Sequence, residues 1–129
     1  MKKILIVDDN IMIRKLIKNL LLSNCNGEEI LIYEAEEGRE GLDILSNNEC
    51  DLVITDILMP GMEGIEFIIN LKNKYEGIKI IAMTEGMPFY LHMAKNLGVD
   101  RTFTKPLNHK EFKDSVFELI FDTKAKQII

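Results

Sequence analysis

The sequence contains very little cysteine and proline, and it has no tryptophan. Of its 129 residues, two are cysteines and three are prolines. Cys25 and Cys50 form neither a CxxC pair nor the dense cysteine framework of a small secreted domain. A single bridge between them is compatible with the sequence, but the pattern favours free thiols in a reducing compartment.

Basic residues are also fewer than acidic residues. Lysine and arginine number 16 against 21 aspartates and glutamates, which leaves a formal net charge of −5. A protein that binds nucleic acid directly needs a basic face to neutralise phosphates. The charge balance therefore argues against direct nucleic-acid binding.

Long apolar runs are missing as well. No stretch approaches the roughly 20 apolar residues that a membrane helix needs. The run at residues 4–7 is stopped by Asp8 and Asp9, so it is too short for a secretion signal. We therefore expect a cytoplasmic protein with no membrane contact.

The residues that are present suit one hydrophobic core. Hydrophobic residues make up 47% of the chain and charged residues 29%, which is ordinary for a globular protein of one domain. We expect a single domain over residues 1–122, a C-terminal tail at residues 123–129, and no further domain.

Short apolar runs alternate along the chain with segments of helical periodicity. The runs are typical of strands that are buried on both faces, and each is followed by an amphipathic segment. Such alternation predicts a doubly wound α/β fold, with a parallel sheet and helices on both faces. The predicted strands are residues 4–7, 30–33, 52–55, 78–83 and 101–104.

Local composition adds detail to two of these segments. In the first helix, Ile13, Leu16, Ile17, Leu20 and Leu21 mark the apolar face, with Arg14 between them. The second helix is expected to begin only after Gly41, because Gly38 and Gly41 weaken helix formation. The acidic residues before it, Glu34, Glu36 and Glu37, are predicted to form a solvated loop.

Polar side chains follow four of the predicted strands. Asp8 and Asp9 follow the first, Asp56 the third, Thr84 the fourth and Lys105 the fifth. Because the carboxyl ends of parallel strands lie at one edge of a sheet, we expect these side chains to meet. A Pro60-Gly61 turn is expected just after Asp56.

Three carboxylates in one crevice need a cation. Two unit charges ~5 Å apart repel by about 3 kcal/mol at an effective dielectric constant of 20. Lys105 supplies one positive charge, and a hard divalent ion bound by oxygen atoms would supply more, so Mg²⁺ is expected, with Mn²⁺ as a substitute. This arrangement suits phosphoryl transfer onto Asp56, since a carboxylate can act as the nucleophile.

The chain resembles the receiver domains of two-component response regulators over almost its whole length. The matching segments are ILIVDDN with Arg14, DLVITDILMPGMEGIEFI, IIAMT, and the pair Lys105-Pro106. The resemblance is to a stand-alone receiver without an output domain. It implies a flavodoxin-like (βα)5 fold whose five-stranded parallel sheet has the order 2-1-3-4-5.

The resemblance also implies roles for single residues. Asp56 would be the phosphoacceptor. Mg²⁺ would be held by Asp9, Asp56 and the main-chain carbonyl of Leu58, with Asp8 helping through water. Thr84 and Lys105 would bind the phosphoryl group.

The implied partners follow from the same likeness. The donor would be a phosphohistidine on a sensor histidine kinase or a histidine phosphotransfer protein. Phosphorylation would change binding to an unknown downstream protein at the face formed by helix four, strand five and helix five. The protein would be a monomer or a weak phosphorylation-dependent dimer. Its only catalysis would be its own phosphorylation and autodephosphorylation.

The chain departs from the usual receiver pattern at several positions. Glu85 follows the switch threonine, where a small residue is common, and we expect its bulk and charge to slow phosphorylation by small donors. Thr102 occupies the usual position of the switch aromatic residue, with Phe103 beside it. These modulators motivate an alternative, a receiver-like interaction module that is not phosphorylated. A Mg²⁺-dependent phosphohydrolase ranks lower, because Leu58 stands where such enzymes carry a second acid.

Overall fold

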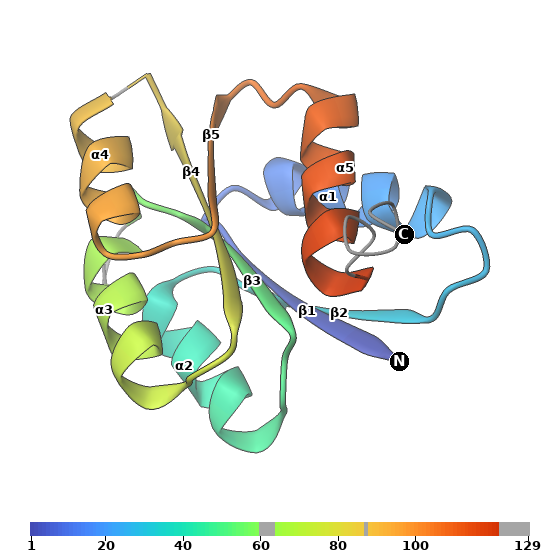
Figure 1. Cartoon of the computed structure of the whole chain (residues 1–129), viewed down its shortest axis with the longest axis horizontal. Helices are drawn as coiled ribbons and strands as arrows, with labels where there is room; N and C mark the ends of the chain where they lie inside the picture. The colour runs from blue at the N-terminus through green and yellow to red at the C-terminus, as the bar shows by residue number, and fades with distance from the viewer. Residues whose placement is uncertain (60–63, 87, 122–129) are drawn as a thin grey trace, which may run out of the picture.

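The structure, a computed structural model of the chain, describes residues 1–59, 64–86 and 88–121. In this part of the chain, strands and helices alternate from the amino terminus onward (Figure 1). The elements are β1 (Lys2–Val7), α1 (Ile11–Ser23), β2 (Ile30–Ala35), α2 (Gly38–Asn47), β3 (Leu52–Asp56), α3 (Gly64–Lys74), β4 (Lys79–Glu85), α4 (Pro88–Asn96), β5 (Arg101–Lys105) and α5 (His109–Phe121).

The five strands form one parallel sheet. Their order is β2-β1-β3-β4-β5, so β1 lies between β2 and β3. The fold class and the strand order predicted from the sequence are therefore confirmed. All carboxyl ends of the strands lie along the same edge of the sheet, as parallel pairing requires.

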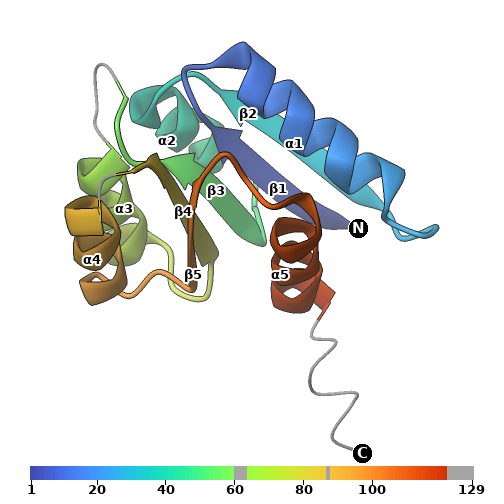
Figure 2. The same ribbon diagram turned by 90° about the horizontal axis from the view of Figure 1, so that it is seen from above.

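Helices cover both faces of the sheet and create two separate cores (Figures 1 and 2). On one face, α2, α3 and α4 bury Leu45, Phe67 and Ala94 against the sheet. On the other, α1 and α5 bury Ile17 and Phe112. Because both faces are covered, β1, β3 and β4 consist largely of fully buried apolar side chains. This rigid centre positions the strand ends.

The expected start of the second helix is wrong. α2 begins at Gly38, so both glycines lie inside the helix. An added Cβ on Gly41 would lie 3.1 Å from the Phe67 ring and 3.2 Å from the Val7 side chain. The glycine allows α2 to approach the sheet closely, and this packing outweighs the low helix propensity.

The expected faces of α1 also need correction. Leu16 is 38% exposed, whereas Arg14 is only 7% exposed. Glu34 lies in β2 rather than in a solvated loop, and its carboxylate is 3.1 Å from Nε of Arg14. The buried guanidinium is tolerated because it has an anionic partner, a pairing that periodicity alone does not reveal.

Several remaining sequence predictions can be placed. Cys25 and Cys50 are free thiols. The Pro60-Gly61 turn and the tail at residues 123–129 lie outside the described residues. Within the described part of the chain, every helix is too short or too polar to cross a membrane.

Candidate functional site

The edge of the sheet formed by the strand carboxyl ends contains a polar cavity of about 280 Å³. Six of the predicted site residues line it together with Asn10. They come from the ends of β1, β3, β4 and β5, so the parallel sheet brings together side chains that are far apart in the sequence. The lining residues are Asp8, Asp9, Asn10, Asp56, Leu58, Glu85 and Lys105.

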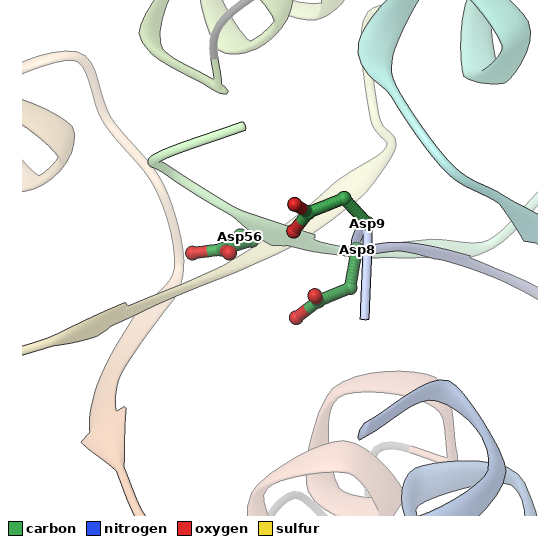
Figure 3. A group of neighbouring side chains, drawn as sticks. All are labelled: Asp8, Asp9 and Asp56. Carbon is green, nitrogen blue, oxygen red and sulfur yellow. The ribbon is translucent and has the colours of Figure 1, made fainter. Parts of the chain in front are cut away.

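Three carboxylates are turned toward the same space at this edge (Figure 3). Each of Asp8, Asp9 and Asp56 offers one oxygen, and these oxygens lie within 4.8 Å of one another. Asp8 is fully buried and Asp56 is 6% exposed, whereas Asp9 is exposed. The close approach that the sequence predicted is therefore present in the structure.

Lys105 bridges the two buried acids. Its Nζ donates to Oδ2 of Asp8 at 2.7 Å and to Oδ2 of Asp56 at 3.2 Å. Burial acts to lower the pKa of Lys105, but the hydrogen bond and charge of Asp8, together with Asp56, outweigh it and raise this pKa above its usual value. Lys105 is thus held as an ammonium between two carboxylates.

The surroundings of Asp56 disfavour its charged form. Burial raises the pKa of Asp56, Lys105 opposes this, and the neighbouring Asp8 raises it further. The N–H of Leu58 points to Oδ1 of Asp56 over 3.4 Å, which helps the charged form only weakly. The net result is a pKa above the usual value for an aspartate, so additional positive charge would be favourable at this carboxylate.

The donor set fits a hard divalent cation. All the acidic ligands are carboxylate oxygens, which Mg²⁺ and Mn²⁺ accept. Within the described residues, the Asp9 carboxylate has no hydrogen-bond donor or ion-pair partner, so it is available to a metal. Asp9 and Asp56 would hold the ion, with Asp8 beside them. The role of the main-chain carbonyl of Leu58 as a further metal ligand stays a prediction.

Thr84 is buried beside the cavity rather than in its lining. It is 0% exposed, and its Oγ1 finds no hydrogen-bond partner among the described residues. A buried hydroxyl without a partner is energetically unfavourable. The contact of this hydroxyl with a phosphoryl group stays a prediction.

The two aromatic-switch positions lie on opposite faces of β5. Thr102 pairs with Ala82, which belongs to the core under α2, α3 and α4. Phe103 packs on the other face, where its ring centroid is 5.1 Å from that of Phe112. Phe103 is thus part of the α5 core and does not replace an aromatic residue on the α4 side.

Two residues of this region were not identified as site residues from the sequence. Asn10 lines the cavity and caps α1, since its side chain accepts the N–H of Met12 at 2.9 Å. In the sequence, Asn10 was recognisable only as a candidate N-cap of the first helix. Arg14 donates from Nη1 to the carbonyl oxygen of Asp8 at 2.7 Å. No sequence pattern predicted that contact.

Comparison with known proteins shows to which family the chain belongs. The sequence model of the family described as the response regulator receiver domain matches residues 4–117. The chain belongs to the response regulator receiver family. Receiver domains act in two-component signalling, and the sequence resemblance is thereby confirmed.

Individual relatives agree with this assignment over most of their length. The chain is 37% identical to the sporulation initiation phosphotransferase F of Bacillus subtilis, covering 89% of this chain and 90% of that one. It is 34% identical to a chemotaxis protein CheY homolog of Campylobacter jejuni, with 92% of each chain covered. A CheY-like receiver structure from Methanospirillum hungatei superposes with a TM-score of 0.82 at 29% identity and 98% coverage of both chains.

Proposed function

We propose that this receiver is a phosphorylation-activated switch of a two-component or phosphorelay system. Asp56 accepts a phosphoryl group from a phosphohistidine on a sensor histidine kinase or a histidine phosphotransfer protein. The observation that carries the proposal is the cavity in which the carboxylates of Asp8, Asp9 and Asp56 lie together and Lys105 bridges Asp8 and Asp56. The likeness to a protein named a phosphotransferase supports it.

The chemistry assigned to the chain is a simple displacement. An Asp56 carboxylate oxygen attacks phosphorus, the phosphorus–nitrogen bond of the donor breaks, and the imidazole nitrogen keeps the electron pair. Asp9 and Asp56 would hold Mg²⁺, which when bound would supply positive charge for the phosphoryl oxygens. Lys105 exchanges part of its contact with Asp8 and Asp56 for the new phosphate, and the Thr84 hydroxyl gains a partner. Hydrolysis of the acyl phosphate by water returns Asp56 to its starting state.

The downstream partner is proposed to bind at α4, β5 and α5. Thr84 lies on β4 against this side of the molecule, and β5 is an edge strand. Phe89 of α4 is 68% exposed and offers apolar area to a protein. A change at Thr84 would then alter the equilibrium between two arrangements of this face. Such a switch would work in the cytoplasm as a monomer or a weak phosphorylation-dependent dimer.

Removal of the metal is expected to prevent phosphorylation. Because four acidic side chains and only one ammonium line the cavity among the described residues, a phosphoryl dianion needs further positive charge. Incubation with an acyl-phosphate donor in Mg²⁺ should add one phosphoryl group at Asp56, detected by intact mass and peptide mapping. The same incubation in excess chelator should add none, and added Mn²⁺ should restore the label. Equal labelling in chelator would contradict the proposed metal role.

The alternative is a receiver-like interaction module that works without phosphorylation. Glu85 favours it, since this exposed acid lines the cavity beside Asp8, Asp9 and Asp56. The labelling experiment separates the two. A chain that is never labelled by a protein phosphodonor or by a small one, yet still binds a partner, would support the interaction module.

Neutralising Glu85 is expected to speed phosphorylation by small anionic donors. Four acidic side chains and one lysine line the cavity, so an anionic donor is repelled. Removing one carboxylate at effective dielectric constants near the surface should lower the barrier by about 1 kcal/mol, which corresponds to roughly fivefold. The measurement is the initial rate of acyl-phosphate labelling in Glu85→Ala and Glu85→Gln.

The comparison of these two variants separates charge from bulk. Glu85→Gln keeps the size, so an equal gain in both assigns the effect to charge, and high salt should then reduce the gain. Glu76→Ala, which removes an exposed acid from the opposite edge of the sheet, is the matched control and should leave the rate unchanged. A Glu85→Ala rate no higher than that of the unmodified chain would refute the expectation.

A further inference from the structure

Arg14 is a buried cation near the start of α1, close to the acidic cavity but outside it. A buried guanidinium requires hydrogen-bond acceptors on several sides. Nη1 of Arg14 donates to the carbonyl oxygen of Asp8 at 2.7 Å, and Nε donates to Oε1 of Glu34 at 3.1 Å. One side chain therefore joins α1 to the carboxyl ends of β1 and β2.

The contact to Asp8 completes a set that holds this residue on every side. The N–H of Asp8 donates to the carbonyl oxygen of Ala35 at 3.1 Å. Its Oδ1 accepts the N–H of Asn10 at 2.9 Å, and its Oδ2 accepts Nζ of Lys105 at 2.7 Å. Arg14 supplies the remaining contact, to the carbonyl oxygen.

Fixing the Asp8 carbonyl also fixes the beginning of Asp9. The carbonyl group of one residue and the N–H and Cα of the next lie in one rigid peptide plane. The Asp9 carboxylate is exposed and has no side-chain partner within the described residues, so no other contact of its own holds it at the cavity. Its position depends on the orientation of the Asp8–Asp9 peptide.

We propose that Arg14 is a positioning residue for the metal site. Its hydrogen bond to the Asp8 carbonyl orients the Asp8–Asp9 peptide and so holds the Asp9 carboxylate toward Asp56. This inference rests on the proposed function, because it takes Asp9 as a ligand of Mg²⁺. Groups behind metal ligands typically change metal affinity by 10–100-fold when they are removed.

A purely structural role for Arg14 makes a different prediction. If Arg14 served only as an ion-pair partner of Glu34, which also pairs with Lys18 over 3.6 Å, loss of the Arg14–Glu34 pair would change stability and leave metal affinity unchanged. If Arg14 acted only through its charge, its removal would tighten Mg²⁺ binding, since a nearby cation repels the ion. The positioning role predicts weaker binding, which is opposite in sign to the charge effect.

The test compares the double variant Arg14→Gln/Glu34→Gln with Glu34→Gln alone. The double variant keeps the net charge and leaves no unpaired buried ion, whereas Glu34→Gln breaks the ion pair and keeps the bond from Arg14 to Asp8. Mg²⁺ alone is titrated into each protein, and the amide NMR shifts of Asp9 and Asn10 report half-saturation. Amide dispersion and urea unfolding of the same samples show that each variant is folded.

We expect the double variant to need about tenfold more Mg²⁺ for half-saturation, with Glu34→Gln within about threefold of the unmodified chain. A folded double variant that binds Mg²⁺ as well or better overturns the inference, as does equal weakening in Glu34→Gln. If the double variant does not fold, Arg14→Lys takes its place. The lysine ammonium keeps the charge without the two-donor fork, and unchanged affinity there also overturns the inference. Absence of Mg²⁺ binding by the unmodified chain would overturn the proposed function as well.

Discussion

Replacing Asp56 by asparagine is expected to abolish phosphoryl labelling and, in metal-free buffer at neutral pH, to raise the free energy of unfolding. The labelling is lost because an amide oxygen cannot form a stable acyl phosphate. Asp56 is 6% exposed and shares its cavity with two other carboxylates. Removing one buried charge from this group should stabilise the fold by roughly 1 kcal/mol, a gain limited by the lost contact to Lys105.

The sign of the pH dependence follows from the raised pKa of Asp56. Burial lifts this pKa above the ordinary value of 3.8 despite Lys105, so the folded chain binds this proton more tightly than the unfolded chain does. The stabilisation by protonation is full below pH 3.8 and is lost as the pH rises through the higher folded pKa. Asparagine is neutral throughout, so its advantage is full at neutral pH and shrinks on acidification.

Urea unfolding of both proteins in chelator across this pH range measures the difference. Asp43→Asn is the matched control, because Asp43 is an exposed acid on α2, and it should change neither labelling nor stability. Added Mg²⁺ should stabilise the unmodified chain and have much less effect on the asparagine variant, since binding to the folded state raises its stability. If the asparagine variant were less stable than the unmodified chain at neutral pH, the charged Asp56 carboxylate would not destabilise the fold as expected.

The second large effect is expected at Gly64, the first residue of α3. Its N–H donates to the carbonyl oxygen of Ile57 at 2.8 Å, so the start of α3 is held directly against the residue that follows Asp56. A Cβ at this position would overlap the carbonyl oxygen of Asp56 and the Cα of Ile57. These are backbone atoms of a buried segment, so they cannot move without displacing Asp56. Gly64→Ala should therefore destabilise the fold by about 3 kcal/mol or more.

Gly41→Ala provides the comparison for this prediction. Its Cβ would press on the side chains of Phe67 and Val7 at 3.1 to 3.3 Å, and side chains can shift by a few tenths of an ångström. We expect a loss of about 1–2 kcal/mol there. Urea midpoints at constant m-value measure both changes. A Gly64→Ala loss no larger than that of Gly41→Ala would contradict the expectation that the backbone of Asp56 and Ile57 cannot make room for a Cβ at Gly64.

The fold could be predicted from local patterns because those patterns are strong here. Continuous apolar runs identify strands that are covered on both faces, and their alternation with amphipathic segments leaves few topologies. The start of α2 was misplaced for a tertiary reason. Gly38 and Gly41 are poor helix formers, yet the close packing of α2 on Phe67 outweighs that preference.

The sequence by itself determined which side chains meet at the sheet edge. Asp8, Asp9, Asp56 and Lys105 follow buried strands, and parallel pairing alone is sufficient to bring such positions together. The need for positive charge at this edge also follows from the sequence, since three neighbouring carboxylates repel one another whatever their exact orientation.

Only the tertiary structure decided how these side chains divide their roles. Lys105 lies closer to Asp8 than to Asp56, and Asp9 is left without a partner in the described part of the chain. Arg14, on the expected polar face of α1, is buried against the Asp8 carbonyl. Such contacts depend on the position of each helix on the sheet to within an ångström. The packing of the whole core determines these positions, and no local sequence pattern encodes that packing.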